Sequence, residues 1–359
     1  MKMIKLQLAC CMILLVNDMQ AQAPKFSNDF LNIGVGARGM ALGTAVTAST
    51  DNVNAAYWNP ANLVGVGSNF QVGAQHAEWF SGIGKYDYLG FGKKFGDNDK
   101  SFGAISLIRM GIDNIPNTLR LRGPDGSIDY SRIEEFSVTD YALIGSYGRH
   151  IPKAKLDVGV NAKVIFRNFG SFANAFGFGF DLGASYQVSS KFKVSAMARD
   201  VTTTFNAYKF SFTEEEKAVL YQTNNEVPTS SVEYTLPKLI LAGMYKFQFG
   251  ANYNLVPELD LEISNNGSAA SLIGGDKIAM DPRLGLEFGL YNKVYLRTGV
   301  NNIQRVLKED NSGERELSMY PSAGIGIKLK KLSLDYAMTN IANTGVGLYS
   351  HYFSLLLNF

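Results

Sequence analysis

Long runs in which apolar and polar residues alternate constrain the fold of this chain more than any other feature. From about Ser68 onward such runs recur through nearly the whole sequence, and they look about 10–14 residues long. Successive side chains of a β-strand point to opposite faces, so a period of two indicates strands with one apolar face. Strands in globular sheets usually have ~5–6 residues, whereas ~9–11 tilted residues cross a bilayer. The clearest run places six apolar residues on one face: Leu156, Val158, Val160, Ala162, Val164 and Phe166.

The number and spacing of these runs predict a barrel. We count about fourteen candidate strands, an even number as bacterial barrels have. Their approximate centres are Val72, Leu89, Leu107, Leu143, Ala162, Phe180, Val194, Ala242, Leu261, Leu286, Leu296, Ile327, Leu334 and Leu355. Tight connections alternate with long ones, and short periplasmic turns with long outer loops are the barrel pattern. The long connections are Asp113–Glu135, Val201–Thr235, Ser264–Asp281 and Asn302–Met319.

A soluble β-sandwich alternates in the same way, so three further features decide between the two folds. The polar face is rich in Gly and carries charges, which suits a wet or plugged lumen. The connection lengths are asymmetric, and aromatic residues gather toward strand ends as in an interfacial girdle. These aromatics are Tyr86, Tyr88, Tyr141, Tyr147, Tyr245, Phe247, Tyr291 and Tyr295. The predicted fold class is therefore all-β, a transmembrane antiparallel β-barrel of about 14 strands.

Both ends of the chain fit an outer-membrane barrel. Residues 1–23 read as a signal peptide, with Lys2 and Lys5 before a short apolar run and a small-residue cleavage site after Ala21 or Ala23. No apolar run is long enough for a transmembrane helix. The last strand ends on an apolar face, as outer-membrane barrels finish, although an edge strand of a sandwich could do the same. The expected assembly signal on that face is Phe353, Leu355, Leu357 and Phe359.

Composition and motifs argue against several functions. The formal net charge is +2 and no run of Lys or Arg forms a basic stripe, which argues against nucleic-acid binding. The three histidines lie far apart, and no spacing suggests metal ligands or a nucleophile. We therefore expect no enzyme, no cofactor and no metal site. The inward charges are expected to pair along the lumen: Asp157, Lys163, Arg167, Asp181, Arg199, Arg283, Glu287, Arg297 and Asp335.

Residues 24–67 lack alternation and precede the barrel, residues 68–359. Gly34 to Gly39 satisfy G-x-G-x-x-G, but the strand and helix that a dinucleotide site needs are missing. A tight turn packed against other backbone is the better interpretation. Asp51 can cap a short helix that runs through Tyr57, and Asn59 and Pro60 should end it, because the residue before a proline avoids the α region.

This N-terminal segment carries a family resemblance. The blocks Ala37, Arg38, Gly39, Met40, Gly43 and Trp58, Asn59, Pro60, Ala61 resemble the PorV/PorQ family of Bacteroidota outer-membrane proteins, which is related to FadL-type barrels. TLPKLILAGMYKF, KLSLDYAM and HYFSLLLNF also look like it, whereas Ala41-Leu42 depart from its glycine pattern. The resemblance implies a FadL-like barrel whose residues 24–67 fold into the lumen as a hatch. Its hatch residues here would be Arg38, Gly39, Trp58, Asn59 and Pro60, with room left by Gly177, Gly179 and Gly183.

The resemblance also implies a role in type IX secretion. The protein would dock an SprA-like translocon, or secreted cargo with C-terminal signal domains, through its outer loops. The candidate partner-binding residues, in the loop Val201–Thr235, are Phe205, Tyr208, Phe210, Phe212 and Tyr221.

Two other functions remain open. One is a FadL-like outer-membrane channel for hydrophobic small molecules, with lateral exit through a broken strand and a hydrophobic ligand or lipid as partner. Gly111 and Pro116 would end the third strand early, where FadL-type barrels open sideways. The other is a structural barrel in outer-membrane lipid.

Overall fold

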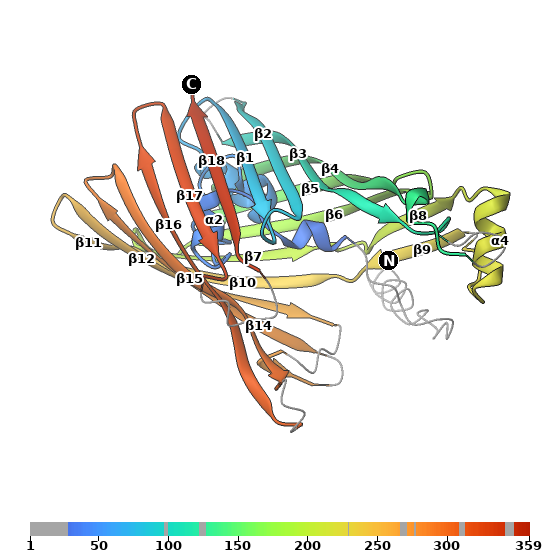
Figure 1. Ribbon diagram of the computed structural model, residues 1–359. Coiled ribbons are helices and arrows are strands. Elements are labelled where there is room, and N and C mark those ends of the chain that lie inside the picture. The colour runs from blue at the N-terminus through green and yellow to red at the C-terminus, as the bar shows by residue number, and fades with distance from the viewer. Residues whose placement is uncertain are drawn as a thin grey trace.

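The computed structural model describes residues 28–96, 100–121, 127–228, 230–265, 271–275, 278–308, 313–341 and 348–359. The expected signal peptide lies outside these residues. The described chain forms one antiparallel sheet that closes on itself, because β1 (Phe70–Trp79) pairs with both β2 (Gly84–Phe95) and β18 (Ser350–Asn358). Figure 1 shows the short N-terminal helices, in blue, enclosed by this ring of strands.

Fourteen strands make up the barrel. β7 (Phe192–Arg199) and β8 (Thr204–Phe210) are two parts of one strand, since both pair with β6 (Ala173–Gln187). β9 (Ser230–Thr235), β10 (Lys238–Tyr245) and β11 (Phe247–Phe249) likewise follow one line, and β13 (Ile273–Gly274) only extends the edge. The others are β3 (Ser101–Asn117), β4 (Glu134–Ile151), β5 (Leu156–Phe169), β12 (Tyr253–Ser264), β14 (Ala279–Leu290), β15 (Val294–Leu307), β16 (Arg315–Lys328) and β17 (Leu332–Thr339). Each of the fourteen predicted centres falls in a different barrel strand, so the predicted fold class is confirmed.

The outer connections are shorter than predicted because the strands continue past the membrane-length core. β3 runs to Asn117 through a bulge after Ile112, with Asn114 at φ 58°, and keeps pairing with β4. The prediction that Gly111 ends this strand is therefore wrong. More than a third of Val201–Thr235 is strand, and its remainder holds α4 (Glu214–Gln222), whose Thr213–Glu216 capping box is complete. Figure 1 shows β8, β9 and α4 projecting beyond the ring at the loop end.

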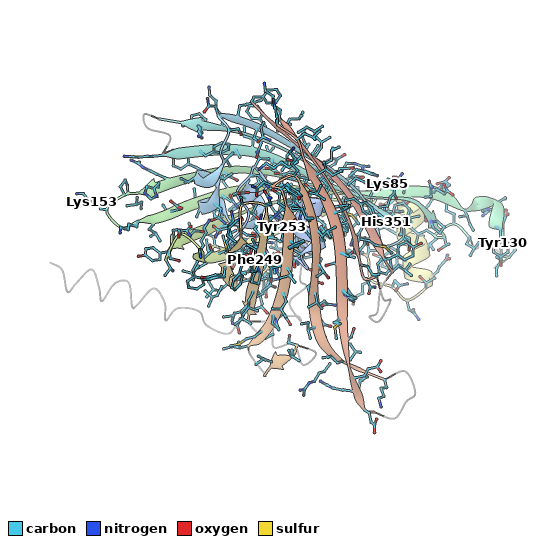
Figure 2. All side chains as sticks on the ribbon, turned by 90° about the vertical axis from the view of Figure 1, so that its left-hand side faces the viewer. Lys85, Tyr130, Lys153, Phe249, Tyr253 and His351 are labelled. Atoms are coloured by element: carbon cyan, nitrogen blue, oxygen red, sulfur yellow. The ribbon has the colours of Figure 1, made fainter. Side chains whose placement is uncertain are left out.

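Alternation sets the two faces of the wall as the sequence predicts. On β6, Phe176, Phe178, Phe180 and Leu182 are 44–57% exposed, whereas Asp181 between them is 4% exposed. The girdle prediction is wrong for Tyr86 and Tyr88, which are 0% and 3% exposed and point inward. On β2 they alternate with outward Leu89 and lie on the same inward face as Gly84 and Gly90. Phe249 and Tyr253, labelled in Figure 2 on the side that faces the viewer, flank the turn between β11 and β12.

The N-terminal segment, residues 28–67, lies inside the ring. It contains η1 (Asp29–Asn32), α2 (Ala37–Ala41), α3 (Ala55–Trp58) and η2 (Pro60–Gly65). Asn59 ends α3 as predicted, because it is extended and its side chain accepts a hydrogen bond from the Ala61 amide. The predicted cap at Asp51 is wrong, since the helix begins only at Ala55 with Asn54 at the N-cap. Trp58, Tyr57 and Met40 pack with inward residues of the wall into one core. Among the described residues, no helix has the length and apolar character to cross a membrane.

Candidate functional site

The N-terminal segment is held together around Trp58. The Trp58 indole N–H donates to the Val35 carbonyl at 2.9 Å, and the Tyr57 hydroxyl donates to the Leu31 carbonyl at 2.5 Å. A Cβ at Gly39 would lie 2.9 Å from the Trp58 ring, so only glycine lets the indole reach this position. Gly34, at φ 109°, lies against the same ring. The G-x-G-x-x-G sequence is therefore a tight turn around an indole, as the sequence indicated.

Inward glycines of the wall make room for the segment at two places. A Cβ on Gly159 or Gly183 would clash with Asn59, Pro60 or Ala61. The chain around Leu42 needs the same room, because a Cβ on Gly285, Gly299 or Gly324 would clash with it. The expectation that Gly177 and Gly179 serve this purpose is wrong: they face Asn206 and Thr204 of β8.

Charged and amide side chains of the wall hold the segment in place. Arg38 Nε donates to Glu287 at 2.8 Å, and Arg297 joins Glu287 to Asp335 at 2.7 and 2.6 Å. Burial opposes the charge of Arg38, but Glu287 raises the pKa of the guanidinium above its ordinary value, so Arg38 stays a cation.

Backbone amides of the segment are bound as well. The Ala48 amide donates to Glu258 at 2.6 Å and the Thr47 amide to Asp260 at 3.1 Å.

The segment separates two cavities in the lumen. One, of about 680 Å³, opens at the turn end and is lined by Arg38, Ser49 and Lys330 among others. The other, of about 390 Å³, lies toward the loop end and is lined by Ile33 and Met40. The packed segment lies between these two cavities.

The wall is interrupted at one place next to this segment. Residues 200–203 separate β7 from β8, whereas only residues 236–237 separate their partners β10 and β9. Asp200 and Thr203 both have positive φ, 55° and 59°. Strand bulges of this kind often occur next to functional sites.

Lys163 closes the interruption with two carboxylates. Its Nζ lies 2.7 Å from Asp181 Oδ1 and 2.6 Å from Asp200 Oδ1, and its side chain is 5% exposed. The Asp200 amide donates to Asp181 at 2.9 Å, and the Thr204 hydroxyl donates to Asp200 at 2.5 Å. The irregular backbone is thus fastened to the regular strands β5 and β6 through charge-assisted hydrogen bonds.

Cavities lie on both sides of the interruption. Inside, a small cavity of about 20 Å³ is lined by Leu31, Tyr57 and Ile144 and by the Lys163 cluster. Outside, a mostly apolar groove of about 850 Å³ runs over β2–β6 and reaches Val201 and Thr202; we call it the outer groove. Asn161 and Asp181 line both.

A row of aromatic rings lies at the loop end on the inward face. Successive rings are 5.1–6.2 Å apart, from Phe136 to Phe172 and from Phe212 through Phe210 and Tyr208 to Phe169. Arg167 stacks over Phe169 at 5.1 Å and pairs with Asp140 at 2.8 Å. This aromatic row offers an apolar surface that leads toward the Lys163 cluster along β5 and β8.

The candidate partner-binding residues do not form one loop surface. Phe205, Tyr208 and Phe210 belong to β8, so their placement in a loop is wrong; the strand continues because β9 pairs with it. Tyr208, Phe210 and Phe212 belong to the inward aromatic row, whereas Phe205 points outward and Tyr221 lies exposed on α4. The pattern at Tyr208 and Phe210, aromatic at every second residue, was the signal for an inward strand face.

The other sequence-based expectations concern assembly and chemistry. Phe353, Leu355, Leu357 and Phe359 lie on the outward side of the last strand; their role in assembly stays a prediction. The predicted pairing of inward charges is confirmed for Lys163, Arg167, Arg283 and Arg297. In the part of the chain that the structure describes, no group of three His, Cys, Asp or Glu could hold a metal ion.

Comparisons with known proteins address the fold. No protein-family model and no curated protein matches the chain. The monoaromatic hydrocarbon channel CymD is similar in structure, with a TM-score of 0.57 at 11% identity over 91% of this chain and 98% of that one. The Pseudomonas putida toluene transporter TodX has a TM-score of 0.57 at 12% identity, over 94% of this chain and 100% of that one. A Pseudomonas aeruginosa FadL homologue has a TM-score of 0.54 at 11% identity, over 93% of this chain and 99% of that one. Identities this low compare folds alone, and the fold of this chain is that of the FadL-like outer-membrane barrels.

Proposed function

We propose that this protein is an outer-membrane channel for hydrophobic small molecules, which leave it sideways through the wall. The observation that carries the proposal is the interruption at residues 200–203, where a cavity inside and the outer groove outside share Asn161 and Asp181 as lining. The similar structures whose names describe hydrocarbon channels and a toluene transporter support it.

The route begins at the aromatic row. Rings of Phe136, Phe172 and Phe212 present apolar surface at the loop end, and hydrophobic molecules partition there from water. From the row they pass the Lys163 cluster to the cavity beside Tyr57, which at about 20 Å³ must widen to admit them.

The surroundings of that small cavity favour a lateral exit over an axial one. The segment 28–67, as a hatch, blocks the axis, and the turn-end cavity beyond it is lined by charged groups such as Arg38. An apolar molecule is poorly solvated there, whereas the outer groove lies on the other side of Asn161 and Asp181 and opens to the bilayer. The exit thus lies between β7 and β8, not at the third strand.

Lys163 acts as the latch of this exit. It joins Asp181 on β6 to Asp200 in the interruption, so separating these groups opens the wall between cavity and groove. A buried ion pair suits such a switch because its geometry is all-or-none.

The test is uptake by cells. The protein is expressed in a Gram-negative host whose own channels for hydrophobic compounds have been deleted, and uptake of labelled toluene and of a labelled fatty acid is measured. Deleting residues 201–203 removes the three residues by which the line of β7 and β8 exceeds its partner β6, and is expected to reduce uptake to the level of cells without the protein. The control deletes Asn224 and Asn225 in the loop after α4 and should retain uptake.

Two outcomes would contradict the channel. Unchanged uptake after the wall deletion, in a variant that still shows heat-modifiable folded protein, would exclude the lateral exit. An intact protein that takes up neither compound but co-purifies with a translocon or cargo would favour the type IX docking role, which the comparisons leave without support.

A further inference from the structure

The outer groove has a floor that leaves open space. Gly103 on β3, Gly145 on β4 and Ala162 on β5 line it, between larger side chains such as Phe91 and Phe180. A Cβ built on Gly145 would have no heavy atom within 4 Å. The lining is mostly apolar, and its exposed side chains belong to the outward faces of the strands, so the groove faces the lipid. Ala104, Ser146, Asn161 and Asp181 line it from the buried side.

A cation stands at the turn-end corner of the groove. Lys93 lines it on β2, opposite Val201 and Thr202 at the far side. The Lys93 side chain is exposed. Lys93 pairs with Gly103 on β3, and Gly103 pairs in turn with Tyr147 on β4, so the three residues lie in one row across the strands. Four strand spacings separate β2 from β6, about 19 Å at ~4.8 Å each, which accommodates an extended fatty acyl chain.

Exposed lysines are numerous at the turn end of the barrel, although the connection from β2 to β3 carries Asp97 and Asp99 in its sequence. The described residues of the turns at 152–155, 188–191, 250–252, 291–293 and 329–331 contain no Asp or Glu. Figure 2 shows Lys153 at this end far from Tyr130 at the loop end. The exposed lysines at this end are Lys93, Lys100, Lys153, Lys155, Lys191, Lys246, Lys293, Lys328, Lys330 and Lys331. These lysines attract anionic headgroups, each adding to the attraction.

We propose that the outer groove binds one anionic phospholipid from the leaflet at the turn end. Its phosphate contacts Lys93, and one acyl chain lies along the groove over Gly103, Gly145 and Ala162 toward Val201. Charge complementarity selects the head, because Lys93 and the surrounding lysines are cationic. The apolar lining and the open floor select the chain. This site does not depend on the channel function, since it requires no movement of the Lys163 latch.

The experiment is native mass spectrometry of the protein released from nanodiscs that contain equal amounts of phosphatidylglycerol and phosphatidylcholine. The intact protein is expected to retain one phosphatidylglycerol. Lys93→Gln should lower that retention about fivefold, the contribution of one lysine near an anionic surface. Gly145→Phe fills the groove and should abolish retention of both lipids, without strain because its side chain enters open space.

Matched controls separate this site from general attraction. Lys85→Gln removes an exposed lysine from the loop end of the same strand, and Leu143→Phe enlarges an outward residue of β4 that does not line the groove. Both should retain the lipid, and all variants must show heat-modifiable folded protein. Equal losses for Lys85→Gln and Lys93→Gln, or full retention by Gly145→Phe, would overturn the site. Oleate that displaces the phospholipid and depends on Lys93 to the same degree would assign the groove to a free fatty acid instead.

Discussion

At the scale of single residues, inward glycines are as important for the position of the N-terminal segment as the side chains that bind it. Gly159 and Gly183 allow Pro60 and Ala61 to lie directly on the wall, so the N-terminal segment and the barrel share one core. Sequence alone indicated that inward glycines leave space, but it could not tell which glycines face the segment and which face β8. That depends on where a chain without periodicity comes to lie, which no local pattern records.

Gly159→Val should therefore disturb the seat of the segment. The added atoms overlap Pro60, and overpacking of this kind costs about 1–3 kcal/mol. Urea unfolding of the refolded barrel in detergent measures the change. Gly145→Val, which enters open space, is the control and should unfold like the original protein. Equal stability of the two variants would mean that the segment does not depend on this contact.

Lys163→Met should destabilise the protein by about 3–5 kcal/mol, because it leaves Asp181 and Asp200 buried without their cation. Combining it with Asp181→Asn and Asp200→Asn removes the stranded charges and should restore much of the loss. The same urea titration measures all variants. If the triple variant is no more stable than Lys163→Met, the loss does not come from unpaired charge.

At the scale of elements, periodicity predicts strands well and their ends poorly. Every predicted centre lies in a strand because each strand has one apolar face. The sequence analysis assigned parts of β3, β8 and β15 to loops. These parts continue beyond the bilayer, where a strand no longer needs an apolar face, so they lack the pattern that predicts strands. The break at residues 200–203 also carries no sequence signal of its own, since Val201 and Thr202 suit a strand.

The last strand tests assembly. Leu357→Asp, or removal of Phe359, should reduce insertion, because a carboxylate on the lipid face costs up to about 2 kcal/mol and the final strand must close against β1. Heat-modifiable protein in isolated outer membranes is the measurement. Lys331→Asp in the exposed turn before β17 places the same charge outside the lipid and should insert normally. Normal insertion of Leu357→Asp would show that this face is not read during assembly.

At the scale of the whole molecule, residues 28–67 and the barrel wall are joined by contacts on several sides of the lumen. Arg38, Thr47 and Ala48 are bound to wall residues of β12 and β14. Ala41 lies against Gly324 of β16, half of the ring away from the Gly159 contact on β5. The segment therefore spans the lumen from wall to wall, and its removal should leave a ring of strands around an open passage.

Deletion of residues 29–67 should convert a silent barrel into a conducting one. The two cavities of about 680 and 390 Å³ would join once the packed segment between them is gone. Single-channel recording in planar bilayers is the measurement, and deletion of residues 223–228 after α4 is the control. A deletion variant as silent as the intact protein would show that another part of the chain closes the lumen.

The same interlocking has a consequence for the order of events in biogenesis. The segment that leaves the translocation machinery first is bound by the strands that emerge last: the Ala37 amide donates to Ser354 on β18, and a Cβ on Gly324 of β16 would meet Ala41. β18, which pairs with β1 to close the ring, thus also binds the segment inside it. We therefore expect closure of the ring and seating of the N-terminal segment to be coupled steps of folding, because the same C-terminal strands make both sets of contacts.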